Sequence, residues 1–195
     1  TYSLTDTLRA TAGVRYTDDQ KRTVDTLGND VTFEDDNVSY RLGLEYDLAP
    51  DNLIYLTYST GYVAGGANGG DVNLPTSPDR AAPIFPNEEM TSIEFGSKNR
   101  FLGNELQLNL AAYYYEFEHY QFFQPAFTNN VDAPSGAIQD MGDVDTYGVE
   151  FDVIYQPTLN DRFTFSGAWA EGEYSELQLA VFSGGPPNFV PGVYT

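Results

Sequence analysis

The sequence predicts an all-β fold: a fragment of about seven strands from an antiparallel up-and-down transmembrane β-barrel. Three observations support this prediction. Apolar and polar residues alternate with a period of two in seven stretches, each bounded by Gly, Pro, Asn or Asp. Short and long connections between these stretches follow one another in strict alternation. Helical periodicity is absent, and no run of about eighteen apolar residues could form a membrane-spanning helix.

The clearest strand is predicted over residues 38–48. Val, Tyr and Leu occupy its even positions, while Ser, Arg, Gly, Glu and Asp occupy its odd positions. Because successive side chains of a strand point to opposite faces, this strand has one apolar face and one charged face. The same division predicts further strands over residues 8–17, 54–58, 93–98, 106–112, 147–155 and 163–169.

The connections between the predicted strands fall into two classes. Tight turns are expected at residues 5–7, 49–52, 102–105 and 157–161. Long polar segments, interpreted as loops, cover roughly residues 22–36, 63–90, 121–143 and 175 to the end. Strict alternation of the two classes places all tight turns at one end of the sheet and all long segments at the other. Outer-membrane barrels have this asymmetry, with short periplasmic turns and longer extracellular loops.

The apolar face has the length and the borders of a lipid-facing surface. Following the apolar positions upward, the first acidic residue comes after about ten residues, at Asp18, Glu116 and Glu171. Outer-membrane lipid is therefore the expected partner of this face. Aromatic residues near both strand ends are interpreted as the interfacial belts of a barrel. They are Tyr16, Tyr62, Tyr114 and Tyr147 on the loop side, and Tyr46, Tyr155 and Phe101 on the turn side.

Seven strands are too few for a closed barrel. Residues 1–4 are interpreted as the tail of an earlier strand, and bacterial single-chain barrels close with even strand numbers from eight upward. An open sheet would leave unpaired backbone groups at two edges, which is unfavourable in lipid. We therefore expect residues 1–195 to be an interior part of a larger barrel domain.

Composition excludes several other functions. The chain has 29 Asp+Glu and 9 Lys+Arg, a net charge of −20, which argues against nucleic-acid binding because phosphate contacts need clustered basic residues. It has no cysteine and a single histidine, His119, so no thiolate or histidine-rich metal site can form. Acidic residues at 34–36 and at Asp140, Asp143 and Asp145 are interpreted as solvated loop charge. Neither a cofactor nor an enzymatic activity is expected.

Four strings resemble the TonB-dependent receptors of Gram-negative outer membranes. They are ATAGVRYTDDQK at 10–21, VSYRLGLEYDLAPDNLIYLTYSTGYVAGGAN at 38–68, NEEMTSIEFGSKNRFLGNELQLNLAAYYYEFEHYQ at 87–121 and DTYGVEFDVIYQP at 145–157. They look like successive barrel strands of that family and follow its order, including its tyrosine-rich strand before a glycine pair.

The resemblance implies a 22-stranded barrel around an N-terminal plug. It also implies uptake of a scarce small-molecule ligand: a metal chelate such as a ferric siderophore, a vitamin such as cobalamin, or an oligosaccharide. In this family the TonB protein supplies energy by gripping a segment near the receptor's N-terminus. Neither that segment, nor the plug, nor the C-terminal strands are found in this sequence, so TonB is an expected partner only through a region outside it.

The charged face is interpreted as the lining of the lumen. Both signs of charge are interleaved along it, which suits contact with a plug. A ring of charge that selects ions in a porin would favour one sign. The lumen-lining or plug-facing residues are Arg9, Arg15, Arg41, Glu45, Glu94, Lys98 and Glu150, accompanied by Asp47, Asp152 and Arg162.

Aromatic residues of the third long segment and the strand before it are candidates for ligand binding. Aromatic rings can stack on a siderophore, a corrin or a sugar while losing few rotamers. The alternative is that these rings fill space beneath the loops and pack the loop on itself. The candidates are Tyr113, Tyr115, Tyr120, Phe122 and Phe123, with Phe117 and Phe127 nearby.

Two other functions stay open from the sequence. A passive porin has the same wall but no plug and needs no source of energy. A soluble, acidic β-sandwich that binds a ligand also alternates between apolar and polar residues. In a sandwich the apolar face would be covered by a second sheet.

Overall fold

The computed structural model describes residues 1–24, 30–67, 84–126, 135–175, 177–183 and 188–194. Within these ranges strands dominate, and the one helical element is a short 3₁₀ turn, η1 (Leu102–Asn104). The strands are β1 (Tyr2–Ser3), β2 (Leu8–Val24), β3 (Asp30–Ala49), β4 (Asn52–Val63), β5 (Gly66–Ala67), β6 (Ile84–Phe85), β7 (Glu88–Phe101), β8 (Leu106–Glu118), β9 (Gln121–Ala126), β10 (Ser135–Asp140), β11 (Asp143–Tyr155), β12 (Phe163–Ser175), β13 (Leu177–Ser183) and β14 (Asn188–Tyr194).

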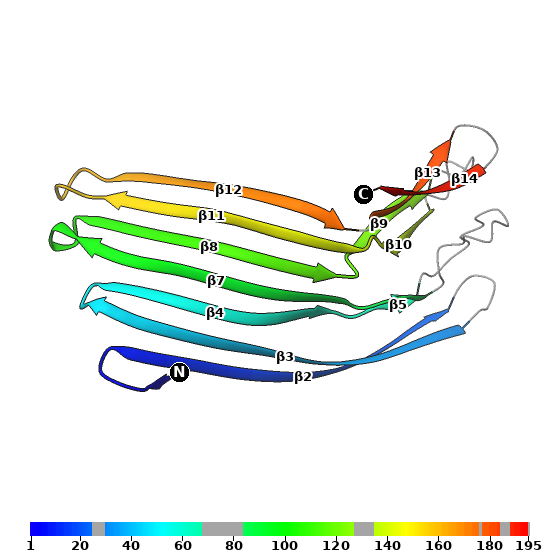
Figure 1. The fold of residues 1–195 in the computed structure, drawn as a ribbon, viewed down its shortest axis with the longest axis horizontal. Coiled ribbons are helices and arrows are strands. Elements are labelled where there is room, and N and C mark those ends of the chain that lie inside the picture. Colours follow the sequence, from blue (N-terminus) through cyan, green and yellow to red (C-terminus); the bar gives the residue numbers. More distant parts are fainter. Residues whose placement is uncertain (25–29, 68–83, 127–134, 176, 184–187, 195) are drawn as a thin grey trace.

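Eight strands form one antiparallel sheet in the order β1-β2-β3-β4-β7-β8-β11-β12. Each long strand pairs with the next long strand along the chain, so the sheet runs up and down. The four tight turns lie together at one end of the sheet, and the remaining connections leave from the other end (Figure 1). This arrangement confirms the predicted all-β fold, its seven long strands and the separation of turns from long segments. The short β1 is the predicted strand tail.

The register joins like residues across the whole sheet. One row of paired residues is apolar throughout: Ala10, Leu44, Leu56, Phe95, Ala112, Val149 and Trp169. The adjacent row lies on the opposite face and consists of Arg9, Glu45, Tyr55, Gly96, Ala111, Glu150 and Ala168. We call these two sides the apolar face and the polar face. A slip of one residue would exchange the faces, so the need to keep every apolar residue on one face fixes the register strongly.

The apolar face is uncovered. Val14 is 78% exposed, Phe165 66% and Trp169 54%. The buried hydrophobic residues of the described chain are Phe85, Met141 and Val144, which belong to strands or connections at the end opposite the tight turns. No second sheet of the described chain packs on the apolar face, so the sandwich alternative does not fit this structure.

The apolar face has a height suited to a lipid bilayer. Tyr155 pairs with Phe163 near the tight turns, and Tyr147, eight residues earlier in β11, pairs with Tyr114. Eight residues of antiparallel strand span about 27 Å, which a tilt of about 40° reduces to about 20 Å. The apolar band of an outer-membrane barrel is about 25 Å tall. Acidic residues begin in the Tyr114 row itself, where Glu171 pairs with Tyr147, and continue with Glu116 in the next row.

Parts of the segments interpreted as loops are strands. β2 and β3 extend through most of residues 22–36, while β5–β6, β9–β10 and β13–β14 form two-stranded pairs in the other three segments. In β2 and β3 polar residues such as Asp18, Asp19 and Asp36 occupy both faces beyond the band, so the hydrophobic alternation disappears although the backbone pairing continues. The acidic residues at 34–36 therefore lie on β3 and not in a loop, and Tyr16 lies in the middle of β2. Phe127 lies outside the described residues.

Two glycines on the polar face lie beneath tyrosine rings. A Cβ added at Gly96 would lie 2.5 Å from the phenol of Tyr55 and 2.6 Å from the Leu110 carbonyl oxygen. A Cβ at Gly148 would lie 2.6 Å from the Tyr113 hydroxyl. Absence of a side chain thus lets each ring lie against the neighbouring strand, as in the pairing of aromatic residues with strand glycines.

We expect Gly148→Val to reduce the folded fraction of the intact protein. The added side chain would overlap the Trp169 carbonyl oxygen, 2.5 Å from the Cβ position, and displace Tyr113, at a cost of about 1–3 kcal/mol. The matched control is Gly13→Val on the same face, where an added Cβ meets nothing within 4 Å. The measurement is the fraction of protein that migrates as the compact form on unheated gel electrophoresis. Equal folded fractions for the two variants would contradict the proposed role of Gly148.

Candidate functional site

Three of the predicted lumen-lining charges pair with one another at the turn end of the polar face. Arg9 Nε donates to Glu45 at 3.0 Å, and both terminal nitrogens of Arg9 donate to Asp47, at 2.5 and 2.7 Å. All three side chains are partly exposed. Arg9 faces Glu45 across the β2–β3 ladder, so the register creates this cluster. The sequence placed these residues on one face but did not identify them as partners.

Five other predicted lumen-lining residues also lie on the polar face: Arg15, Arg41, Glu94, Lys98 and Glu150. None of them forms an ion pair with another residue that the structure describes. The Lys98 ammonium lies 5.7 Å from the centre of the Tyr55 ring, within the range of a cation–π contact. These five charges are therefore free to meet charged groups from another part of the protein.

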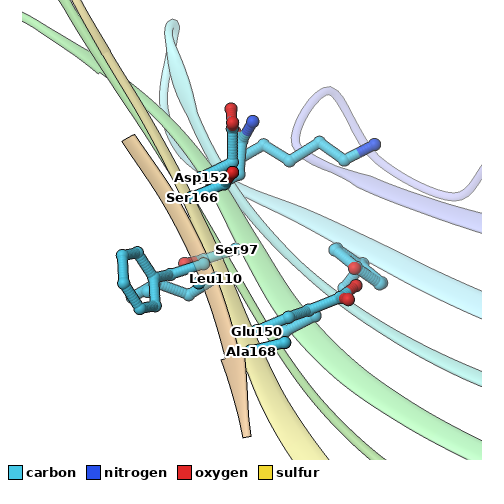
Figure 2. A pocket seen from close by; sticks show the side chains of 12 residues that line it. Ser97, Leu110, Glu150, Asp152, Ser166 and Ala168 are labelled. Atoms are coloured by element: carbon cyan, nitrogen blue, oxygen red, sulfur yellow. The ribbon is translucent and has the colours of Figure 1, made fainter. Parts of the chain in front are cut away.

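A hollow of 510 Å³ opens between β4, β7, β8, β11 and β12, and twelve residues border it. Tyr55, Lys98 and Glu150 border it on the polar face, where Ala111 and Ala168 leave room because their side chains are small. Figure 2 shows Glu150 and Ala168 on the opposite side of the sheet from Ser97 and Leu110. On the polar face of the hollow, Tyr55 can form a hydrogen bond with a partner, and Lys98 and Glu150 can form ion pairs with it.

The candidate ligand-binding aromatics occupy two places. Tyr113 and Tyr115 belong to strand β8, where their rings stack with centres 4.8 Å apart and planes 18° from parallel. They lie on the polar face, since Tyr113 pairs with both Glu94 and Gly148.

The other candidates follow β8. Tyr120 meets the Phe117 ring edge to face, at 5.8 Å between centres. Phe122 and Phe123 are 44% and 59% exposed on β9, and as neighbours in a strand they point to opposite faces of their hairpin. The structure therefore brings Tyr113 and Tyr115 together but does not gather all five candidates into one cluster.

Sequence reasoning missed a group of contacts that we call the rim clasp: Lys21, Gln121 and the backbone carbonyls of residues 64, 65 and 86. Lys21 Nζ donates to the carbonyls of Ala64 and Gly65, at 3.1 and 2.9 Å. Gln121 Nε2 donates to the carbonyls of Ala64 and Pro86, at 3.4 and 2.9 Å. The clasp therefore fixes the start of the β4–β7 connection against β2 and β9.

Close packing surrounds the rim clasp. Gly65 and Gly66 are buried, and a Cβ at Gly65 would lie 2.6 Å from both the Phe33 ring and the Phe85 carbonyl oxygen. Gly66 pairs with Phe85 in the β5–β6 ladder. The sequence contained one indication of the rim clasp, which was the position of Lys21 on the polar face of β2. A glutamine that binds carbonyls leaves no pattern in the sequence.

An exposed ion pair also links β2 and β3 at the end of the sheet opposite the tight turns. Arg22 forms a two-point contact with Asp30, with nitrogen–oxygen distances of 2.6 and 2.8 Å. This contact lowers the pKa of the Asp30 carboxyl below its ordinary value. Because both side chains are exposed, we regard the pair as a local link at the end of the hairpin.

The described residues contain neither a metal-binding cluster nor a helical membrane span. No group of three or more His, Asp or Glu side chains among them is placed to hold a metal ion. No helix in the described ranges has the length and apolar character needed to cross a membrane.

Comparison with known proteins identifies the family. A sequence model described as "TonB dependent receptor-like, beta-barrel" matches residues 1–194. The chain belongs to the TonB-dependent receptor family. Members of this family are receptors and transporters of the Gram-negative outer membrane and not enzymes. No curated protein sequence matches the chain significantly.

Solved structures show the same fold. The chain resembles the ferric yersiniabactin uptake receptor FyuA from Yersinia pestis, with a TM-score of 0.63, 22% identity, and coverage of 89% of this chain and 25% of FyuA. It also resembles the siderophore receptor PiuA from Acinetobacter baumannii, with a TM-score of 0.67, 18% identity, and coverage of 96% and 26%. The copper transporter OprC gives a TM-score of 0.62 at 19% identity, with coverage of 87% and 27%. The chain thus spans about a quarter of the length of these proteins.

We expect Lys21→Met to loosen the β5 segment. The change removes two hydrogen bonds from a charged donor to backbone carbonyls, so amide exchange at Gly66 and Ala67 in the intact receptor should accelerate several-fold. Arg15→Met is the control, because it removes the same charge from the same face of β2. Hydrogen–deuterium exchange mass spectrometry measures both variants, and equal exchange in this segment would show that Lys21 does not hold it.

Proposed function

We propose that this chain is part of the barrel wall of an outer-membrane receptor that takes up a scarce nutrient with energy delivered through TonB. The observation that carries the proposal is the single sheet with an uncovered apolar face and a polar face of mixed charge. In the described chain, β12 pairs only with β11, and β2 is met on its far side only by the two-residue β1. In lipid these edges need further strands, since each unpaired backbone group costs several kcal/mol.

We assign the polar face to contact with a plug domain. Arg15, Arg41, Glu94, Lys98 and Glu150 supply both signs of charge without ion-pair partners in the described wall. A plug can satisfy such charges one by one, whereas a passive pore that selects ions would favour a single sign. Arg9 and Glu45 contribute less to this contact, because they already bind within the wall.

We assign ligand contact to the aromatic residues at the extracellular side. The stacked rings of Tyr113 and Tyr115 lie on the polar face, while Tyr120, Phe122 and Phe123 lie at or beyond the end of β8. Flat aromatic surfaces suit a metal chelate, a corrin or a sugar. The similar solved structures are named as a ferric yersiniabactin uptake receptor, a siderophore receptor and a copper transporter, which favours a metal or a metal chelate.

The test is uptake by cells that carry the intact receptor. The probes are ⁵⁵Fe bound to hydroxamate or catecholate chelators, ⁶⁴Cu, ⁵⁷Co-cobalamin and ¹⁴C-labelled oligosaccharides. We expect at least one probe to accumulate, and to stop accumulating in cells without TonB or after collapse of the proton gradient. Uptake that persists without TonB would indicate a porin. Absence of receptor-dependent uptake for every probe would overturn the proposal.

We expect Ala112→Arg to destabilise the receptor much more than Ala111→Arg. Ala112 lies on the apolar face between Phe95 and Val149, whereas Ala111 lies on the polar face between Gly96 and Glu150. An arginine facing lipid between the midplane and the interface costs about 1–3 kcal/mol, and one facing the aqueous side costs less. Urea unfolding of receptor folded into lipid vesicles measures the difference. Equal losses would show that the apolar face does not contact lipid.

A further inference from the structure

The β9–β10 hairpin joins the barrel wall through two residues with positive φ. His119 follows β8 with φ of 55°, and Gly142 precedes β11 with φ of 85°. This conformation is easy for glycine but uncommon for histidine. Between them, two backbone hydrogen bonds continue the pairing: the Tyr120 N–H donates to Gly142 at 2.9 Å, and the Met141 N–H donates to Tyr120 at 3.0 Å. The base of the hairpin therefore turns at His119 and Gly142, and Gln121 fastens β9 separately, since its backbone N–H donates to Glu88 at 2.8 Å and its side chain belongs to the rim clasp.

The His119 side chain spans this connection. Its Nδ1–H donates to Asp140 Oδ2 at 2.8 Å, since an ionised carboxylate can only accept. The other oxygen of Asp140 accepts from the Gly142 N–H at 2.9 Å. The backbone N–H of His119 donates to Asp143 at 3.2 Å. Asp140 therefore links the end of the hairpin to both residues with positive φ.

The groups around His119 are acidic on every packed element. They are Asp140 on β10, Asp143 on β11 and Glu118 on β8, with Glu89 of β7 paired to Glu118 in the sheet. The hydrogen bond to Asp140 raises the pKa of the His119 imidazole above its ordinary value of 6.5. Burial opposes this shift, and the negative charges of Asp140, Asp143 and Glu118 add smaller upward contributions. The contact is therefore strongest below about pH 6.5 and weakens as the pH rises through the folded-state pKa.

We propose that the junction of β8, β10 and β11 is a pH-sensitive hinge, in which charged His119 bound to Asp140 holds the β10 side of the β9–β10 hairpin and loss of the imidazolium charge loosens this hold while the Gln121 contacts remain. The hairpin carries Phe122 and Phe123, so the hinge sets how these rings are presented at the mouth of the barrel. Any effect on ligand capture rests on the function proposed above. The motion of the hairpin does not, and it is measured without a ligand.

The experiment is hydrogen–deuterium exchange of the intact receptor in detergent micelles at pH 6 and pH 8.5, corrected for the intrinsic exchange rates. We expect peptides covering Gln121–Ala126 and Ser135–Asp140 to lose about two- to fivefold of their protection at the higher pH, the range of an exposed ion pair. In His119→Asn this pH dependence should vanish. Asparagine tolerates positive φ but does not titrate, so it keeps the backbone turn.

Asp140→Asn provides the second variant, because the amide keeps a hydrogen-bond acceptor for His119 while the negative charge is removed. Its pH dependence should shrink, whereas the wall peptide Leu106–Glu118 should be unchanged in every variant. Protection that is independent of pH in the wild type would overturn the hinge, as would an equal pH dependence in His119→Asn. Failure of ligand uptake with an intact pH response would contradict the proposed function and leave the hinge standing.

Discussion

Pairing of the backbone across lipid is the constraint on which the rest of this structure depends. A strand in hydrocarbon has no water to bind its N–H and C=O groups, so each must find a partner in the next strand. The seven long strands meet this requirement in an unbroken series from β2 to β12. Once the pairing is continuous, the period of two divides the wall into a face for lipid and a face for the lumen. One register thus joins Leu44 to Leu56 on the apolar face and Glu45 to Tyr55 on the polar face.

The distribution of charge follows from the same division. The apolar face is free of charge between the Tyr155 row and the Tyr114 row. Glu171 lies in the Tyr114 row, and Glu116, Asp145 and Glu173 follow in the next row. The polar face carries charge along its whole length, which fits the lumen-lining role proposed for it. The strong net charge of −20 is therefore compatible with a membrane wall: the excess acid lies beyond the lipid band and the charges inside are mixed.

The features that could be predicted from the sequence are those that contact with lipid constrains. Strand positions, the tight turns and the aromatic rows follow from alternation and from the limited height of the band. The Arg9–Asp47 contact required the exact pairing of β2 with β3, which depends on turn length as well as on pattern. Beyond the band neither face has to be apolar, so the alternation is lost. In β9, Phe122 and Phe123 occupy successive positions, and the β9–β10 strands were interpreted as loop. Gln121 was missed because its partners are carbonyls, which every residue has.

This chain shares its fold with the similar receptor structures, whereas individual side-chain contacts are particular to it. TM-scores above 0.6 at about 20% identity mean that the fold needs the alternating pattern and not particular side chains. Lipid accepts any apolar residue of suitable size, so Leu44 could be Val or Ile without changing the wall. The rim clasp and the His119–Asp140 contact have no such freedom, because each depends on one donor placed against one acceptor. At the rim the physical demand is therefore for individual atoms, whereas in the lipid-facing wall it is for a class of residue.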